Sequence, residues 1–291
     1  MELQGCELVY AQERYESEWC STHYLSTMFK RVSNRIQGTS ISFVVCSATD
    51  QLPKTKYNNK VILLCGDELG QGPAFDTNDP HILAIFRQHN HKINKCEKTY
   101  PMPMGYNTRS KLPGENHNKH SVLDVADVAD VDARDIDILY IGNSHVPDRV
   151  RLLESLTNLK SYLDTKNTII GTTPTFATGV HVQEFHSLLE RTKIALVPRG
   201  GAPETYRFCE AAYHGCSIIT TYINKDVWYY SDFPGTFITD WTGLSEELLE
   251  TCLEEYTENS PITVSRWYSV FLSPNSLATY IASKLDVQQG F

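Results

Sequence analysis

The sequence has no excess of basic charge. Its 26 Lys and Arg residues stand against 35 Asp and Glu residues, which gives a formal net charge of −9 at pH 7. A basic stripe of the kind that binds a phosphate backbone is not evident, so we expect no nucleic-acid partner. The one cationic cluster, HNHKINKCEK at 89–98, is consistent with steering of an anionic ligand or with a solvated loop.

Long apolar runs are also missing. No segment of the sequence reaches the roughly 20 apolar residues that a membrane-spanning helix needs. The first 19 residues carry too many acidic groups for a secretory signal peptide. We therefore expect no membrane span, a soluble protein and a cytoplasmic location.

The eight cysteines lack any ordered spacing. None forms a C-x-x-C pair, and Cys46, Cys65 and Cys216 lie in or beside apolar runs, where a thiol behaves as a small hydrophobe. A secreted disulfide framework is small and cysteine-dense, and this chain of 291 residues is neither. Reduced thiols in a cytosol fit this composition.

Common catalytic motifs are absent as well. The sequence contains no G-x-S-x-G and no P-loop. Possible zinc ligands occur without zinc spacing, at His181, Glu184, His186, His214 and Cys216. Asp-x-Asp occurs at 130–132, inside a repetitive acidic stretch, and at 135–137, at the entry to an apolar run. Neither context favours a metal-bound nucleotide, so we expect no metal site.

Short apolar runs are what the chain does contain, and they fall into two groups. Runs of about five β-branched-rich residues are typical of strands buried on both faces of a parallel sheet. The first group is Ile41–Cys46, Val61–Cys65 and Ile82–Phe86, preceded by a possible helix at 16–35. The second group has strands at 136–141, 168–170, 193–197 and 217–221, and helices at 148–163, 182–191, 204–214, 244–256 and 275–285. Such alternation predicts βαβ units and an α/β fold with parallel sheets.

A polar stretch separates the two groups. It contains the quasi-repeat VLDVADVADVDARD and reads as a linker or exposed loop. We therefore predict an N-terminal Rossmann-like domain at 1–115, a linker at 116–135, a second Rossmann-like domain at 136–274 and a closing helix at 275–291.

The segment KIALVPRGGAPETYRFCEAAYHGC at 193–216 carries the strongest functional signal. A buried strand ends at Val197, and Gly200 and Gly201 then allow tight backbone geometry and a close approach of a ligand. Pro203 stands where a first helical turn begins, and Gly215 suits the end of that helix. A strand, a glycine turn and a helix N-terminus together form an anion-binding corner.

Charged side chains stand around this corner. Arg199 precedes the turn, and Arg207 lies one turn into the predicted helix, where its guanidinium can neutralise phosphate charge. Glu210 follows three residues later on the same side and can accept both hydroxyls of a ribose. The N–H groups that would face a diphosphate are those near Glu204, Thr205 and Tyr206. The alternative is a common α/β turn followed by a surface ion pair between Arg207 and Glu210.

VPRGGAPETYRFCEAAYHGC at 197–216 resembles the donor-site signature of exostosin-like glycosyltransferases of the GT-B fold. The matching residues are Pro198, Arg199, Gly200, Glu204, Thr205, Arg207, Glu210, Ala211, Gly215 and Cys216. The match covers about 30 residues with its flanks, and the rest of the chain resembles the family in layout, with weaker local matches at LLCGDE and PMPMGYN.

The resemblance implies a fold and a donor. It implies two Rossmann-like domains whose parallel sheets face a cleft, with a UDP-sugar between them as donor substrate and no separate cofactor. It places Glu210 on the ribose, Arg207 on the diphosphate and Arg149 as a second phosphate contact, after a turn sharpened by Gly142. The chain is shorter than animal exostosins and lacks their membrane anchor, which suits a microbial or viral relative.

A transferase that inverts the anomeric carbon also needs a base for the acceptor hydroxyl. Asp67 and Glu68, directly after a predicted strand, are the first candidates, although adjacent carboxylates also cap helices. Asp79 and His81 are second choices, and Arg87 is placed to contact donor phosphate or acceptor.

The function expected from the sequence is inverting transfer of a sugar from a UDP-sugar to a hydroxyl of a carbohydrate acceptor. Among possible donors we favour xylose, because exostosin-like folds include xylosyltransferases. Two alternatives stay open, a non-catalytic nucleotide- or glycan-binding module and a nucleotide-sugar epimerase. The aromatic residues Trp228, Tyr229, Tyr230 and Phe233 line a sugar pocket or pack in a core.

Overall fold

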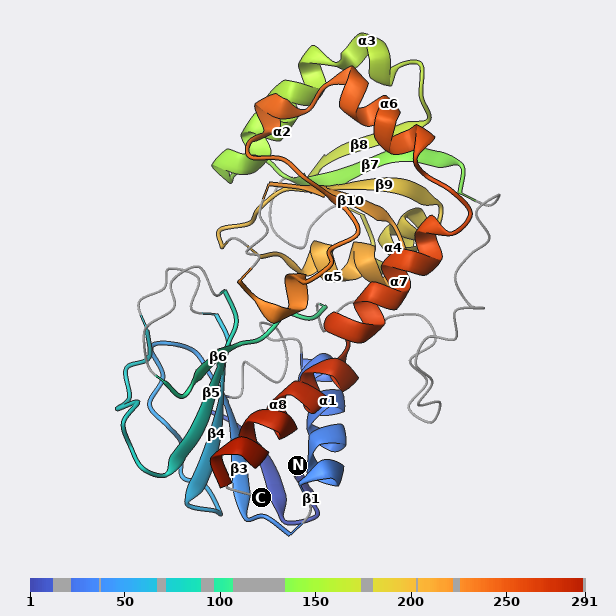
Figure 1. The fold of residues 1–291 in the computed structure, drawn as a ribbon. Helices are drawn as coiled ribbons and strands as arrows, with labels where there is room; N and C mark the ends of the chain where they lie inside the picture. Colours follow the sequence, from blue (N-terminus) through green and yellow to red (C-terminus); the bar gives the residue numbers. More distant parts are fainter. Residues whose placement is uncertain are drawn as a thin grey trace. The chain divides into compact units, whose positions relative to one another are not determined.

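The computed structural model describes residues 1–12, 22–36, 38–66, 72–89, 97–106, 134–173, 180–202, 204–221 and 226–289. The chain forms two compact units (Figure 1). Unit 1 comprises Met1–Lys111, Asp226–Tyr229 and Phe271–Phe291, and unit 2 comprises Leu112–Lys225 and Tyr230–Val270. Each unit is built on a sheet whose strands are mostly parallel, which confirms the predicted α/β class with two Rossmann-like parts.

The sheet of unit 1 has the order β1-β2-β3-β4-β5-β6. Its strands are β1 (Glu2–Leu3), β2 (Cys6–Tyr10), β3 (Ile41–Cys46), β4 (Asn59–Leu64), β5 (Ile82–Arg87) and β6 (Thr99–Pro101). β1 and β2 are antiparallel and every other pair is parallel. All six residues of β3 are buried, as expected for a central strand that is covered on both faces.

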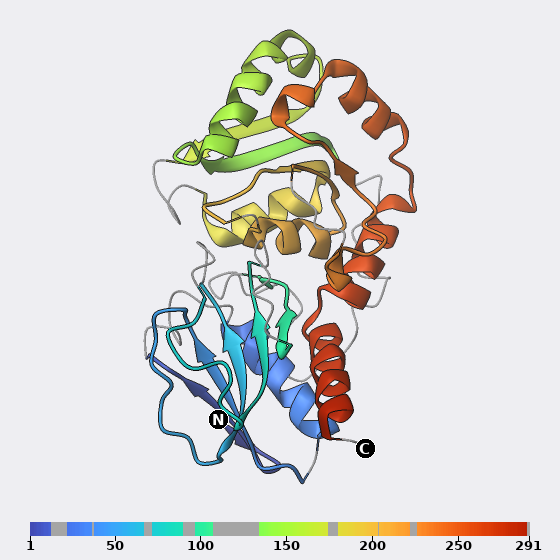
Figure 2. The same cartoon turned by 60° about the vertical axis from the view of Figure 1, so that its left-hand side comes forward.

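Two helices from opposite ends of the chain pack together in unit 1, as Figure 2 shows. They are α1 (Thr22–Arg35) and α8 (Pro274–Gln289). The Tyr24 hydroxyl donates a hydrogen bond of 2.6 Å to the Leu272 carbonyl, just before α8. Trp228 stacks on Tyr280 of α8 with ring centroids 4.4 Å apart. Its indole N–H also donates to the Pro101 carbonyl at 3.1 Å, so both returning segments are tied to the first 111 residues.

Unit 2 contains a five-stranded parallel sheet with the order β11-β10-β9-β7-β8. The strands are β7 (Ile136–Asn143), β8 (Thr168–Thr173), β9 (Thr192–Val197), β10 (Ser217–Thr220) and β11 (Thr236–Phe237). In this order the chain runs from β7 outward to β8, then returns to the other side of β7 to form β9, β10 and β11. The sheet is therefore doubly wound, with its point of reversal between β7 and β9.

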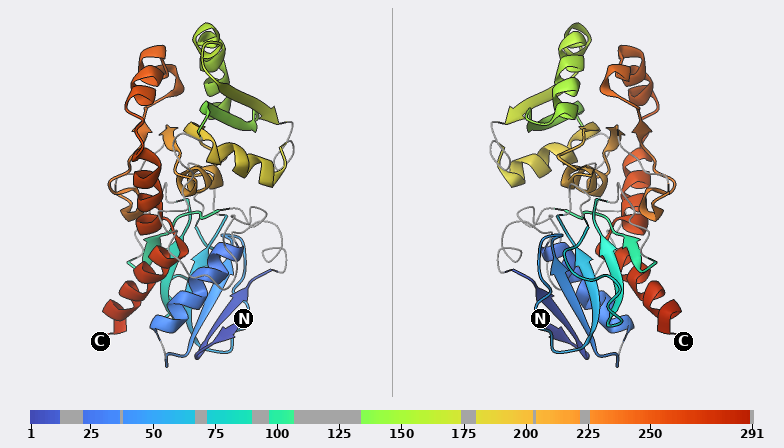
Figure 3. Two further views of the ribbon diagram at one scale, coloured as in Figure 1. Left: turned by 90° about the vertical axis from the view of Figure 1, so that its right-hand side faces the viewer. Right: turned by 90° about the vertical axis from the view of Figure 1, so that its left-hand side faces the viewer.

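Helices cover both faces of this sheet (Figure 3). One layer contains α2 (Pro147–Asn158), α3 (Lys160–Leu163) and α6 (Glu246–Glu254), and the other contains α4 (Val182–Glu190) and α5 (Tyr206–Tyr213), followed by α7 (Ser260–Phe271). Apolar residues of α2, α3 and α6 form one buried cluster with the sheet, in which Leu152, Ile194 and Trp241 are fully buried. Burial of this kind contributes roughly 25 cal/mol for each Å² of apolar surface removed from water.

Several predicted element limits needed correction. The helix predicted at 204–214 begins only at Tyr206, because Thr205 has extended backbone angles, φ −134° and ψ 152°. The helix predicted at 148–163 divides into α2 and α3 at Leu159. α7 was missed; Pro261 in its first turn and its β-branched and aromatic residues weakened the helical signal.

The predicted linker at 116–135 lies mostly outside the described residues. Only Arg134 and Asp135 are described, and they lead directly into β7. The closing helix predicted at 275–291 corresponds to α8, which is part of unit 1. Among the described residues no helix is both long enough and apolar enough to cross a membrane.

Candidate functional site

The switch point of unit 2 brings together the segments that follow β7 and β9. In doubly wound sheets ligands bind beyond the carboxyl ends of the strands at the point where the strand order reverses. β7 ends at Asn143 and leads into α2, while β9 ends at Val197 and leads through the glycine turn into α5. Apart from Gly142, which lies within β7, the predicted donor-site residues of the second half lie in these two connections or on α2 and α5 that follow them.

Asp148, in the first turn of α2, joins the connections to one another. Its Oδ2 accepts hydrogen bonds from the Arg199 backbone N–H at 2.7 Å, the Thr221 hydroxyl at 3.0 Å and the Trp241 indole N–H at 2.9 Å. One carboxylate oxygen therefore holds segments that follow β7, β9, β10 and β11. Sequence reasoning missed this residue, because its three donors come from three separate loops.

Two guanidinium groups converge at this corner. Arg149 is 6% exposed, and its Nε donates to the Arg199 carbonyl at 3.2 Å. Burial lowers the pKa of both Arg149 and Arg207, and each of the two is close enough to the Tyr140 hydroxyl for a Coulomb interaction with it. The charge of Arg207 lowers the pKa of Arg149 further. Neither guanidinium forms an ion pair within 4.0 Å among the described residues, although the carboxylates of Glu204 and Glu210 are also buried near them. Without a close ion pair, both guanidiniums are available to an anion.

Unsatisfied polar atoms accompany these charges. The Nε of Arg207, the Oγ1 of Thr205 and the Oδ1 of Asn143 are buried and have no hydrogen-bond partner in the described part of the chain. Thr205 is the N-cap of α5, yet its side chain does not cap the helix. Buried polar groups without partners are rare in folded proteins. Arg207 Nε and Thr205 Oγ1 can donate at the N-terminus of α5 and suit a bound anion, whereas Asn143 Oδ1 can only accept, for example from a hydroxyl.

The glycine turn keeps space open in front of the arginines. A Cβ at Gly200 would lie 3.2 Å from Thr205 Cγ2 and 3.8 Å from Arg149 Nη2. A side chain there would therefore occupy the approach to Arg149. Gly201 beside it is exposed, and the Gly200 N–H donates to the Ala202 carbonyl at 3.0 Å, which folds the turn on itself. Pro203 lies outside the described residues.

Glu210 is positioned one helical turn beyond Arg207. It is 4% exposed, and its charge acts to raise the pKa of Arg207 against the larger effect of burial. The guanidinium of Arg207 also lies over the ring of Phe185 on α4, 5.6 Å from the ring centroid. The sequence predicted that Arg207 lies one turn inside the helix. Arg207 is instead the second residue of α5 and therefore lies at the helix N-terminus.

The prediction that Gly142 sharpens the turn before Arg149 was wrong. Gly142 lies within β7 and does not form the turn after it. A Cβ at this position would lie 2.7 Å from the Tyr140 hydroxyl, so glycine is required to leave room for that ring. Tyr140 in turn donates to the Asn143 carbonyl at 3.3 Å, at the end of the strand.

The remaining predicted donor-site residues also lie at this corner. Arg199 is exposed, and it serves the corner through its backbone, which contacts Asp148 and Arg149. Glu204 is 6% exposed, and Tyr206 is the first residue of α5. The structure thus brings together the residues after β7 and β9 that the sequence singled out.

The candidate bases belong to unit 1. Asp67 and Glu68 lie outside the described residues. Asp79 lies in the turn before β5, where its Oδ1 accepts the His81 backbone N–H at 2.8 Å. Asp79 therefore lies at the amino end of β5. From the sequence, the catalytic base is expected at the carboxyl ends of the strands, on the opposite side of the sheet. Arg87, at the carboxyl end of β5, is 1% exposed.

Other sequence signals are explained by structure. The second Asp-x-Asp lies at the amino end of β7, where Asp135 pairs with Arg191 at 2.5 Å and Asp137 with Lys193 at 2.7 Å. The first, at 130–132, lies outside the described residues. Tyr230 and Phe233 pack on Phe208 with ring centroids 5.5 and 5.4 Å apart, so these aromatics serve a core. Most of the cationic cluster at 89–98 lies outside the described residues.

Comparison with known proteins gave structural similarities only. No protein-family model matches the chain, and no curated protein matches its sequence. The chain is similar to AviGT4, a glycosyltransferase involved in avilamycin A biosynthesis, with 9% identity, 98% of both chains covered and a TM-score of 0.49. It is also similar to WaaG, a glycosyltransferase involved in lipopolysaccharide biosynthesis, with 15% identity, 98% of this chain and 100% of that chain covered and a TM-score of 0.46.

A third similar structure is an α1,3-fucosyltransferase, with 12% identity, 97% of this chain and 90% of that chain covered and a TM-score of 0.47. At TM-scores below 0.5 these similarities identify neither a donor nor an acceptor for this chain. The resemblance to exostosin-like enzymes rests on the motif residues at 197–216 alone.

Proposed function

We propose that this protein is a glycosyltransferase that moves a sugar from a UDP-sugar to a hydroxyl of a carbohydrate acceptor, with inversion at the anomeric carbon. The observation that carries the proposal is a pair of guanidiniums at the switch point of a doubly wound sheet: Arg149 is buried, and Arg207 is half-buried with its Nε buried. Two positive charges that have no carboxylate within 4.0 Å among the described residues match the two charges of the diphosphate in a nucleotide sugar.

Each part of the donor has a counterpart at this corner. Arg149, Arg207 and the N-terminus of α5 would bind the diphosphate, and the turn at Gly200 would let its oxygens approach the backbone. Glu210, buried on the same helix, would accept the hydroxyls of the ribose. The motif match at 197–216 supports the same assignment of roles.

Sugar transfer requires that the nucleotide diphosphate, which is the leaving group, be stabilised. When the bond between the anomeric carbon and the phosphate oxygen breaks, negative charge grows on the diphosphate, and the two guanidiniums and the helix N-terminus stabilise that charge. These groups supply positive charge without a metal ion. The acceptor oxygen forms the new bond to the anomeric carbon and gives its proton to a carboxylate base, for which Asp67 and Glu68 are the candidates.

Among UDP-sugars we favour UDP-xylose, on the resemblance to a family that includes xylosyltransferases. The first test is a thermal-shift screen of UDP and UDP-sugars against the wild type and Arg207→Met. We expect stabilisation of the wild type by UDP compounds and none of the variant. If no UDP compound stabilises the wild type, the donor assignment is wrong.

The second test separates transfer from binding alone. UDP release is measured with a panel of carbohydrate acceptors for the wild type, Asp67→Ala and Glu68→Ala. Turnover that falls by roughly 100-fold or more in one variant, with unchanged UDP binding, would identify the base. Binding without turnover on any acceptor would favour a nucleotide-binding module, and isomerisation of the sugar without acceptor would favour an epimerase.

A further inference from the structure

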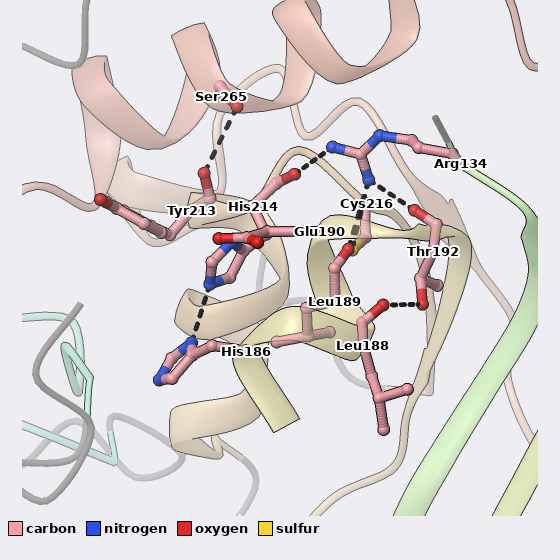
Figure 4. Close-up of polar contacts among 10 residues, drawn as sticks. All are labelled: Arg134, His186, Leu188, Leu189, Glu190, Thr192, Tyr213, His214, Cys216 and Ser265. Carbon is pink, nitrogen blue, oxygen red and sulfur yellow. Dashed lines mark hydrogen bonds and ion pairs between the residues drawn. The ribbon is translucent and has the colours of Figure 1, made fainter. Parts of the chain in front are cut away.

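A buried pair of histidines joins the two helices beneath the sheet of unit 2. His186 lies on α4 and is 2% exposed, while His214 is the C-cap of α5 and is 6% exposed. Figure 4 shows their rings facing one another, and the Nδ1 of His186 lies 2.7 Å from the Nε2 of His214. One ring must donate and the other accept, so the contact requires that the two rings do not both carry a second proton.

The surroundings indicate which ring donates. The Oε1 of Glu190 lies 3.8 Å from the Nδ1 of His214, and a carboxylate favours a proton on that nitrogen. With its proton on Nδ1, His214 accepts at Nε2, and His186 donates from Nδ1. The Nε2 of His186 is then a lone pair, and it is buried without a partner in the described part of the chain.

Positive charge already occupies this region. Arg134 is 2% exposed, and its guanidinium donates to the Thr192 carbonyl at 2.5 Å, to the Leu189 carbonyl at 3.4 Å and to the His214 carbonyl. It thereby binds carbonyl groups at the ends of both α4 and α5, as Figure 4 shows. No carboxylate pairs with Arg134 among the described residues, so a further proton on the histidine pair would add like charge nearby.

The other groups that face the pair do not offset such a charge. Glu190 is half-exposed, and its carboxylate is the nearest anion. The ring of Tyr213 packs edge-on against His214 at 5.0 Å. Near Arg134 lie the thiol of Cys216 and the hydroxyl of Tyr256, and burial raises the pKa of both, so each is neutral. Burial also lowers the pKa of His186, to about 4, while burial, His186 and Arg134 lower that of His214.

The pair also has a mechanical relation to the donor corner. α5 carries Arg207 as its second residue and Glu210 as its fifth, and His214 follows at its C-terminal end. α4 meets both ends of α5, through Phe185 under the Arg207 guanidinium and through His186 at the His214 ring. These contacts with α4 therefore fix the position of α5, and with it the positions of Arg207 and Glu210.

We propose that the His186–His214 hydrogen bond holds α5 where Arg207 and Glu210 bind the nucleotide, and that positive charge added to the pair in acid, which Arg134 repels, weakens this binding. The inference rests on the proposed function for its ligand and on the geometry of unit 2 for its mechanism. Both histidines act as positioning residues, since neither belongs to the donor corner itself.

The test compares variants that keep or break the hydrogen bond. Asn places an amide nitrogen where His has Nδ1, and Gln places a polar atom where His has Nε2. The double variant His186→Asn/His214→Gln therefore keeps a neutral hydrogen-bonded pair that does not titrate. His186→Leu breaks the pair, and His181→Gln, at the exposed N-cap of the same helix, is the control.

The affinity for UDP-xylose is measured by calorimetry from pH ~7.5 down to ~4. A sugar ester is used because a terminal phosphate titrates near pH ~6 and would add its own pH dependence. We expect the affinity of the wild type and of His181→Gln to fall by about fivefold or more in acid, and that of the double variant to stay nearly constant. His186→Leu should bind about tenfold more weakly at neutral pH, with His186→Asn close to the wild type.

A second measurement does not depend on the ligand. Hydrogen exchange of the α5 amides in the free protein should accelerate in acid beyond the intrinsic change in the wild type but not in the double variant. If the double variant has the same pH dependence as the wild type in both measurements, the proposal is overturned. If no UDP-sugar binds at any pH while the exchange result holds, the proposed donor is wrong and the role of the pair in positioning α5 stands.

Discussion

The carboxylate of Asp148 accepts the backbone N–H of Arg199 at 2.7 Å, and this bond ties the start of α2 to the turn after β9. The same oxygen also accepts hydrogen bonds from Thr221 and Trp241. A single side chain thus fixes the relative position of the two connections that carry the arginines. The anion corner is therefore built around an acidic residue that does not itself neutralise them by a close ion pair.

Replacement of Asp148 by Ala should affect both stability and donor binding. Three donors would lose a charged acceptor, and we expect the free energy of unfolding to fall by about 2–3 kcal/mol. UDP-sugar affinity should fall by about tenfold, since the turn that presents Gly200 would lose its anchor. Urea denaturation and calorimetry measure the two effects. The matched control is Asp164→Ala, which removes an exposed pair with Lys160 and should change stability by less than about 0.5 kcal/mol. Equal effects of both substitutions would contradict this role.

Arg207 should contribute to UDP binding and should not stabilise the unliganded protein. Arg207→Met removes a half-buried positive charge that lies near the buried charge of Arg149, so we expect the unliganded protein to be as stable as the wild type or more stable. Loss of a charge-assisted contact should weaken UDP binding by about 10–100-fold. The control Arg191→Met removes an exposed ion pair with Asp135 and should leave binding unchanged. A large loss of stability without a loss of affinity would show that Arg207 has a structural role only.

The elements that the sequence predicted best are those whose environment is uniform. Ile41–Cys46 was predicted to the residue because every position in β3 is buried. The strand predicted at 168–170 extends to Thr173, because its last residues, Gly-Thr-Thr, carry little apolar signal of their own. The start of α5 was placed two residues early, since an extended Thr205 cannot be read from a sequence that allows a helix there.

The arrangement of the proposed donor corner was predictable in part for the same physical reason. Its glycine turn, Arg207 and Glu210 are close in sequence, and local spacing describes them. Asp148 and the histidine pair depend on contacts between residues 28 to 93 positions apart, which no local pattern encodes. The carboxylate candidates at Asp67 and Glu68 stay predictions.

Gly215 should not tolerate a side chain. It adopts a left-handed conformation, φ +73°, and ends α5 in a Schellman arrangement, with Gly215 N–H donating to the Ala212 carbonyl at 3.1 Å and Cys216 N–H donating to the Ala211 carbonyl at 3.0 Å. A Cβ would also lie 2.7 Å from the Pro261 carbonyl oxygen.

Gly215→Ala should therefore lower the free energy of unfolding by about 2–4 kcal/mol, as strain in the backbone adds to the clash. Thermal and urea denaturation measure it. The control is Gly243→Ala, where a Cβ meets nothing within 4 Å and the backbone angle is not left-handed, so stability should stay within about 1 kcal/mol. If both variants lost a similar free energy of unfolding, the left-handed conformation of Gly215 would not be the cause of the loss.

The histidine pair should make stability depend on pH between about 6.5 and 4. In the unfolded chain both rings titrate near pH ~6.5. In the folded protein burial lowers the pKa of both, to about 4 for His186. Below pH ~6.5 the unfolded chain therefore binds more protons than the folded protein, and stability falls as the pH falls, by up to ~1.4 kcal/mol per pH unit for each histidine. Above pH ~6.5 both states are neutral and the pair adds no pH dependence.

Several carboxylates also lose stabilising contacts in acid, for example Asp240, whose pKa is lowered by hydrogen bonds to Thr242 and by Arg151. The contribution of the pair is therefore the difference between the wild type and His186→Asn/His214→Gln in urea denaturation at a series of pH values. We expect a steeper slope for the wild type from pH ~6.5 to ~4 and parallel curves above that range. Parallel curves over the whole range would mean that the two buried rings are already charged in the folded protein, which is incompatible with a hydrogen bond of 2.7 Å between them beside Arg134.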